Sequence, residues 1–123
     1  MKDVVDRPIK TFERVLIDVP CSNSGVLARR PEARYRQDQQ TLRSLEKLQR
    51  DILLDTADCV APTGLLIYST CSIWPEENEQ MARWFLEQHP RFTLLRERST
   101  LPNFQSDPAR YHDGGYFAVF ARK

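Results

Sequence analysis

The sequence predicts an α/β fold built around a mostly parallel sheet. Two continuous apolar runs, at residues 15–17 and 65–68, are typical of strands that are covered on both faces. A long segment with apolar residues at helical spacing lies between them, and a second helical segment follows the later run. Because strands alternate with helices, consecutive strands are expected to lie parallel in one sheet.

The first strand is predicted over residues 14–18. It is preceded by a polar stretch, residues 1–13, that shows no clear period and is expected to be an extended lead-in. Pro20 ends the strand, because proline has no N–H group for the ladder of hydrogen bonds. Residues 23–25 are of types that favour turns, so a loop is expected there.

A long helix is predicted to begin at Asp38 or Thr41, since either side chain can cap a helix N-terminus. Leucine and isoleucine recur along one face as far as Val60, and Pro62-Thr63-Gly64 ends the helix. Between residues 28 and 50 the sequence carries seven basic and three acidic residues, although the net charge of the chain is only +1. This segment is therefore the one basic patch that the sequence offers.

The second helix is predicted to have Pro75 at its first position. The glutamates at 76, 77 and 79 would complement the positive end of its dipole. Strands are expected at 92–95 and 116–121, with a polar loop at 97–113. Since no helix separates these last two strands, they are expected to pair antiparallel.

Composition indicates one ordinary globular domain, with 123 residues of which 41% are hydrophobic and 28% charged. No apolar run reaches membrane-spanning length, and the N-terminus lacks the apolar segment of a secretion signal. We therefore expect a cytoplasmic protein without membrane contact. The cysteines are odd in number and none forms a C-x-x-C pair, which argues against a disulfide framework and a zinc site. Cys59, on the long helix, is interpreted as a packing residue.

The other two cysteines each follow a predicted strand. Cys71 comes after the strand at 65–69, and Cys21 follows Asp18 at the end of the first strand. Because parallel strands end at one edge of a sheet, both thiols and the carboxylate are expected at one crevice, where open α/β sheets bind ligands. Taken alone, Cys71 fits a buried packing role and a nucleophile equally well. A helix start just after it would favour the nucleophilic thiolate.

The stretches around these cysteines resemble two signature motifs of one family. Asp-Val-Pro-Cys-Ser-Asn-Ser-Gly (18–25) and Tyr-Ser-Thr-Cys-Ser-Ile-Trp-Pro-Glu-Glu-Asn-Glu (68–79) are similar to motifs of the RNA cytosine-C5 methyltransferases, the Nol1/Nop2/Sun family. Residues 25–35 and 113–118 resemble its bacterial small-subunit rRNA branch, called Sun or Fmu. The resemblance extends from Thr11 onward. It departs from the usual motif at Val19, where alanine is common, and at Asn23, where glycine is frequent.

The resemblance implies S-adenosylmethionine-dependent methylation of C5 of a cytosine in small-subunit rRNA, through a covalent adduct between a cysteine and C6. Cys71 matches the nucleophile. Cys21 matches the cysteine that assists adduct breakdown and RNA release. Asp18 is expected to contact the cytosine edge and to lie beside the cofactor. The residues expected to bind the substrate are Pro20, Ser22, Arg29 and Arg30, the two arginines through phosphates unless they form only a solvated charged face.

The fold implied is the C-terminal half of a Rossmann-like class I methyltransferase sheet, so residues 1–123 would be a partial domain. The family binds its cofactor through a glycine-rich loop, and none of the four glycines here precedes the first motif. We therefore expect the cofactor-binding half to be absent, the chain alone to bind S-adenosylmethionine weakly or not at all, and its activity to be missing. The strand at 14–18 would be an exposed apolar edge that favours a homodimer or aggregate.

Two further function classes stay open from the sequence. A non-catalytic RNA-binding or assembly module, derived from such a methyltransferase, would keep both motifs without the cofactor-binding half. An amino methyltransferase is a weaker alternative, because Asp-Val-Pro-Cys resembles the Asp-Pro-Pro-Tyr type of motif. The second cysteine motif has no role in that chemistry.

Overall fold

The computed structural model describes residues 10–103, 107 and 109–123, and the side chains of these residues apart from Arg36. The described residues form four strands, two α-helices and two short 3-10 helices. In chain order they are β1 (Phe12–Asp18), the 3-10 helices Ser24–Val26 and Pro31–Arg36, α1 (Gln39–Ala57), β2 (Val60–Thr70), α2 (Glu79–Gln88), β3 (Phe92–Thr100) and β4 (Gly115–Arg122).

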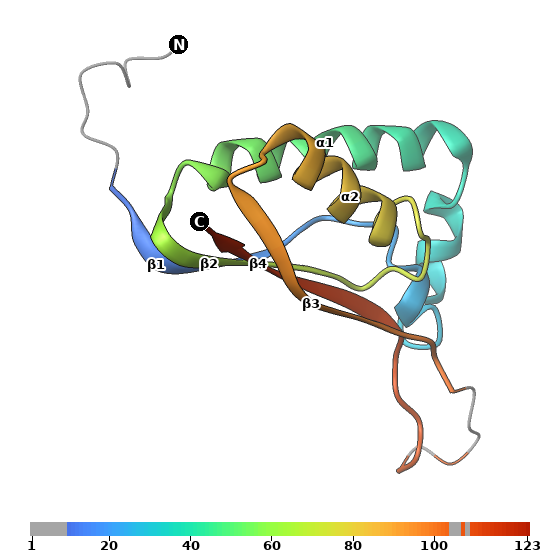
Figure 1. Cartoon of the computed structure of the whole chain (residues 1–123). Coiled ribbons are helices and arrows are strands. Elements are labelled where there is room, and N and C mark those ends of the chain that lie inside the picture. Colours follow the sequence, from blue (N-terminus) through green and yellow to red (C-terminus); the bar gives the residue numbers. More distant parts are fainter. Residues whose placement is uncertain (1–9, 104–106, 108) are drawn as a thin grey trace.

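The four strands form one sheet in the order β1-β2-β4-β3, as Figure 1 shows. β1 and β2 run parallel, with Ile17 opposite Tyr68 and Asp18 opposite Ser69. β4 lies between β2 and β3 and is antiparallel to both. The mixed α/β fold and the antiparallel pairing of the last two strands, both predicted from the sequence, are therefore confirmed.

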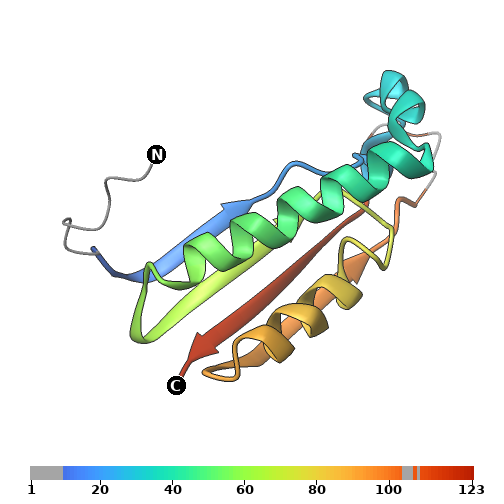
Figure 2. The same cartoon turned by 90° about the horizontal axis from the view of Figure 1, so that it is seen from above.

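Both helices cover the same face of the sheet. Seen from above in Figure 2, α1 lies over β1 and β2, and α2 lies over β3. On this side Leu66 and Tyr68 of β2 and Phe120 of β4 are fully buried against Leu53 of α1 and Phe85 of α2. This core fixes which face of each strand points inward, because a shift of one residue would turn every buried side chain outward.

The opposite face of the sheet carries a second set of apolar side chains. Ile67 of β2 is flanked in register by Leu16 of β1 and Val119 of β4. Leu16 is 68% exposed, whereas Ile67 and Val119 are partly buried. In the described part of the chain β1 is also an edge of the sheet, as the sequence predicted.

Several element boundaries differ from the predictions. α1 ends at Ala57, so Val60 begins β2 instead of continuing the helix, and Cys59 lies half-buried in the connection. The residues predicted to break the helix, 62–64, belong to β2. The pairing of β2 with β1 is irregular over these residues, with a register shift between Phe12 and Arg14, and proline and glycine are tolerated at such irregular positions, which explains the error. β3 extends to Thr100, beyond its predicted end.

The second helix also begins later than predicted. Pro75 is not its first residue; α2 starts at Glu79, after a turn in which the Asn78 N–H donates to the Pro75 carbonyl. Only Glu79 of the three glutamates lies in the first turn. β1 begins at Phe12, so residues 12 and 13 of the predicted lead-in are already strand, and residues 1–9 lie outside the described part of the chain. None of the helices in the described ranges has the length and apolar character needed to cross a membrane.

Candidate active site

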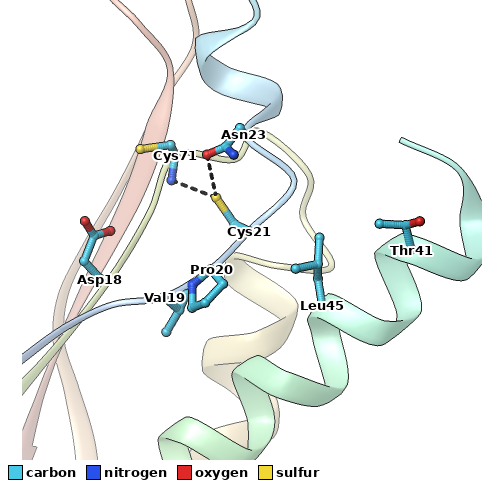
Figure 3. A pocket seen from close by; sticks show the side chains of 8 residues that line it. All are labelled: Asp18, Val19, Pro20, Cys21, Asn23, Thr41, Leu45 and Cys71. Carbon is cyan, nitrogen blue, oxygen red and sulfur yellow. Dashed lines mark hydrogen bonds between the residues drawn. The ribbon is translucent and has the colours of Figure 1, made fainter. Parts of the chain in front are cut away.

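The two cysteine loops leave the sheet side by side. The parallel pairing of β1 and β2 continues one residue beyond β1, where the Val19 N–H donates to the Ser69 carbonyl over 3.1 Å. The loops then touch directly: the backbone N–H of Cys71 donates to the sulfur of Cys21 over 3.3 Å, as Figure 3 shows. The Cys21 thiol in turn donates to Oδ1 of Asn23 over 3.7 Å. The structure thus brings together the two cysteines that the sequence placed at one crevice.

A hollow of about 370 Å³ opens beside these loops. In Figure 3 the Cys71 thiol points to the side on which Asp18 lies, whereas the Cys21 thiol points toward the Cys71 backbone. α1 supplies Thr41 and Leu45 to the opposite wall. The hollow is lined by Asp18, Val19, Pro20, Cys21, Asn23, Thr41, Leu45 and Cys71.

A second hollow, of about 420 Å³, adjoins the first, since Cys71 and Asn23 line both. Its character is basic, because Arg29 and Arg30 line it. Arg29 is already paired with a carboxylate, that of Asp113, at 2.7 Å. Cys71 therefore lies between an acidic side, at Asp18, and a basic side.

Both thiols are held in their protonated form. Burial raises the pKa of Cys21 to about 11, and backbone hydrogen bonds at Asn23 and Cys71 lower it less. For Cys71, desolvation is also the largest cause of a raised pKa; the charges of Asp18 and Asp113 add to it, and the arginines oppose it. The expectation that a helix start stabilises the Cys71 thiolate is wrong, because α2 begins only at Glu79.

Behind the cysteines lies a buried polar network centred on Glu77. The carboxylate accepts hydrogen bonds from the Ser22 N–H (2.9 Å), from the Ser22 hydroxyl (2.7 Å) and, at very short range, from the Ser72 hydroxyl. The side-chain amide of Gln49 donates to Glu77 over 3.1 Å and to the Pro20 carbonyl over 2.9 Å. The residues next to both cysteines are thereby joined to α1.

This network corrects two predictions. The hydroxyl of Ser22 is fully buried and bonded to Glu77, so it holds the loop and is not presented to a substrate. Glu77, predicted to complement the dipole of α2, lies before the first turn of that helix and is bonded to the Cys21 and Cys71 loops instead. Asn78 is the N-cap residue of α2, but its side chain makes no cap bond; it accepts from the Thr70 hydroxyl (2.7 Å) and donates to the Ser72 carbonyl (2.8 Å). The second motif, residues 68–79, places acidic and amide side chains just before a helix. That local pattern alone does not distinguish a helix cap from a buried hydrogen-bond acceptor.

Two glycines complete the site and were not identified from the sequence. The Gly25 N–H donates to the Cys71 carbonyl (2.8 Å), and the Gly114 N–H donates to the Gly25 carbonyl (2.7 Å). A Cβ atom on Gly25 would stand 2.5 Å from the Gly114 oxygen and 2.8 Å from the Cys71 oxygen, so a side chain is excluded there. The segment before β4 thus reaches the cysteine loops by backbone contact.

Of the other candidate groups, Asp18 and Pro20 line the first hollow, and Arg29 and Arg30 line the second. Asp18 lies at the carboxyl end of β1, the edge of the sheet at which open α/β folds bind ligands. Among the described residues, no group of three or more histidine, cysteine, aspartate or glutamate side chains is arranged to hold a metal ion.

The raised thiol pKa values predict a specific pH profile for alkylation by iodoacetamide, which reacts with thiolates. Since burial keeps both thiols neutral, Cys71 should reach half-maximal reactivity at a higher pH than cysteine in a free peptide, and Cys21 near pH 11. Cys21 should also react more slowly, because it is only 7% exposed. Site-resolved mass spectrometry across the pH range measures both. A Cys71 midpoint below that of the free peptide would contradict the structure.

The chain resembles known proteins over most of its length. The family model described as 16S rRNA methyltransferase RsmB/F matches residues 1–117. The chain is 36% identical over 113 residues to ribosomal RNA small subunit methyltransferase B of Vibrio cholerae, covering 91% of this chain and 26% of the relative. It thus spans about a quarter of the length of that curated relative.

Solved structures show the same fold. The crystal structure of PH0851 is 38% identical, with a TM-score of 0.73, and covers 90% of this chain and 26% of that one. NSun6 from Pyrococcus horikoshii with SFG is 20% identical, with a TM-score of 0.71, and covers 93% of this chain and 30% of that one. With the family model matching nearly its whole length, the chain belongs to the 16S rRNA methyltransferase RsmB/F family.

Proposed function

We propose that this chain supplies the nucleophile and the base-binding edge for methylation of C5 of a cytosine in small-subunit rRNA. One observation carries the proposal: two cysteines from separate strands meet, backbone N–H to sulfur at 3.3 Å, beside a hollow that an aspartate also lines. A purely structural pair would not need to adjoin an open hollow. Family membership supports the substrate class, since the family is described by its action on 16S rRNA.

C5 of cytosine is too weak a nucleophile to take a methyl group directly, so the enzyme must first supply a nucleophile of its own that attacks C6. The Cys71 thiolate attacks C6, forming an S–C6 bond and moving the electron pair of the C5–C6 double bond toward C5. C5 then takes a methyl group, which S-adenosylmethionine supplies when bound. Loss of the C5 proton restores the double bond and expels the Cys71 thiolate. The target base must leave its stack to reach such a hollow.

Cys21 is assigned to the release step. Its thiolate would accept the C5 proton while the S–C6 bond to Cys71 breaks. A group whose pKa is raised to about 11 is a strong base once deprotonated but is mostly neutral at pH 7. Release should therefore become faster as the pH rises, and a chain without Cys21 should accumulate the adduct.

S-adenosylmethionine is the proposed methyl donor, and the fit of this chain to it is partial. Asp18 presents a carboxylate at the end of β1, where a polar group of the donor could be held. The four glycines stand at 25, 64, 114 and 115, so these 123 residues contain no glycine-rich loop ahead of Asp18. NSun6, which shares the fold, was solved with SFG. The remaining donor contacts must come from other residues.

The basic hollow is the proposed entry side for RNA. Arg29 and Arg30 are exposed and border Cys71, so phosphates held there would bring a neighbouring base to the thiol. Small-subunit rRNA as the substrate also makes the cytoplasm the proposed location. A non-catalytic RNA-binding module would share this surface, and covalent chemistry separates the two functions.

Covalent trapping tests the proposed reaction. We would replace the matching segment of the Vibrio cholerae relative with this chain and incubate the chimera with RNA containing 5-azacytosine, which blocks release. A covalent protein–RNA band is expected, and it should disappear in Cys71→Ala because the S–C6 bond cannot form. Cys21→Ala should accumulate the adduct even with unmodified RNA.

Cys59→Ala is the matched control, because Cys59 lies in the connection between α1 and β2, outside both hollows. Its trapping should equal that of the parent chimera. If RNA binds but no covalent band forms at any pH, the non-catalytic binding module is the better description. A band that survives Cys71→Ala would assign the nucleophile elsewhere.

The partial donor site gives a second prediction. Isothermal titration calorimetry of the 123-residue chain with S-adenosylmethionine should show no micromolar binding, since Asp18 alone cannot supply the contacts of a ligand of that size. The chimera, titrated in parallel, serves as the control. Micromolar binding to the isolated chain would show that its own residues form a complete donor site.

We also propose that β1 pairs two copies of the chain. Phe12 and Leu16 are 47% and 68% exposed on this edge strand, and an unprotected apolar edge is a template for strand pairing. Leu16→Lys should shift the chain from dimer or larger species toward monomer in analytical ultracentrifugation. Leu95→Lys, at a 61% exposed position on the other edge strand, is the control and should not. A monomeric parent chain at high concentration would overturn the proposal.

A further inference from the structure

We propose that Glu77 is a positioning residue that holds both cysteine loops in their reactive arrangement. The inference rests on the proposed function, because it assigns Glu77 a part in that reaction. Glu77 itself lines neither hollow beside Cys71, so it would act through other residues.

The contacts of Glu77 reach both loops at equivalent positions. Ser22 directly follows Cys21, and Ser72 directly follows Cys71. Glu77 accepts hydrogen bonds from the Ser22 N–H and hydroxyl through its two oxygens, and from the Ser72 hydroxyl through the second oxygen. One carboxylate therefore sets the separation of the two loops, and with it the contact between the Cys71 N–H and the Cys21 sulfur.

A third connection runs to the long helix. Gln49 of α1 is fully buried, and its amide nitrogen bridges the Glu77 carboxylate and the Pro20 carbonyl. Pro20 is the residue before Cys21 and lines the first hollow. The network thus fixes the Cys21 loop from both sides of the cysteine.

Glu77 is only 1% exposed, and the four groups that donate to it are neutral. Burial of a carboxylate is costly unless hydrogen bonds satisfy it, and among the described residues these bonds come from neutral donors. The negative charge of Glu77 therefore acts on the ionisable groups around it. The charge of Glu77 adds to the burial that raises the pKa of Cys21, and Tyr68 also lies within electrostatic reach of Cys21.

Substitution by glutamine separates charge from position. The oxygen of a glutamine can accept from the Ser22 N–H and Gln49, while its nitrogen donates to the two serine hydroxyls, which can rotate to accept. Glu77→Gln therefore preserves the arrangement and removes the charge. Glu77→Ala removes both and leaves the Ser22 N–H without its acceptor.

The test is site-resolved alkylation of the 123-residue chain with iodoacetamide from pH 6 to 11, together with a thermal melt. In Glu77→Gln the midpoint for Cys21 should move to lower pH, because the charge of Glu77 adds to the burial that raises the pKa of Cys21. In Glu77→Ala Cys21 should lose its protection as well, and its reaction at every pH in this range should become faster than in the parent. The matched control is Glu76→Gln, an exposed neighbour, which should leave both cysteines unchanged.

The outcomes are distinct. Unchanged protection of Cys21 in a folded Glu77→Ala chain overturns the proposal. A gain of reactivity that Cys59 shares to the same extent also overturns it, since that indicates general unfolding. If Glu77→Ala does not fold, the Glu77→Gln profile decides alone. The measurement needs neither RNA nor methyl donor, so it can succeed when covalent trapping fails, and the failure of the proposed function stays distinguishable.

Discussion

The parallel pairing of β1 with β2 is the constraint on which the site depends. The pairing places Asp18 opposite Ser69 and adds one hydrogen bond past the end of β1. Both strands therefore end at the same level of the sheet, and a cysteine follows the end of each strand within a few residues. The register cannot slip by one residue without turning the core faces of both strands outward. The contact between Cys21 and Cys71 is thus secured by the hydrophobic core.

The sheet brings the loops near each other, and polar groups then fix their conformation. Gly25 allows the Cys71 carbonyl and the segment before β4 to approach at backbone distance. Glu77 and the serines bond the loops from behind. These groups are buried together with the thiols, so the same desolvation that makes the arrangement rigid also keeps the thiols protonated. Position and reactivity are therefore coupled, and any change that admits water should alter both.

The elements that a periodic pattern defines could be predicted from the sequence. The strand and helix order, the antiparallel last pair and the shared edge of Cys21 and Cys71 follow from apolar runs and from the geometry of parallel sheets. The start of α2 and the burial of Ser22 could not, because they depend on partners distant in sequence. Glu77 illustrates the limit: an acidic residue before a helix has the local pattern of a dipole partner, and only the approach of the first motif shows that it is a buried acceptor.

Cys71 has a position that a nucleophile acting between two different ligands would require. One neighbouring hollow is lined by Asp18 together with uncharged residues; the other is lined by Arg29, Arg30 and Asp113. A polyanion is attracted to the second and repelled from the first, so under the proposed function these charges would orient the RNA with its phosphates on the arginine side. Because Arg29 is already paired with Asp113, a phosphate must compete with that carboxylate. The electrostatic contribution of this surface to the proposed RNA binding should then be modest and sensitive to salt, so the proposed recognition of the cytosine would depend on the first hollow.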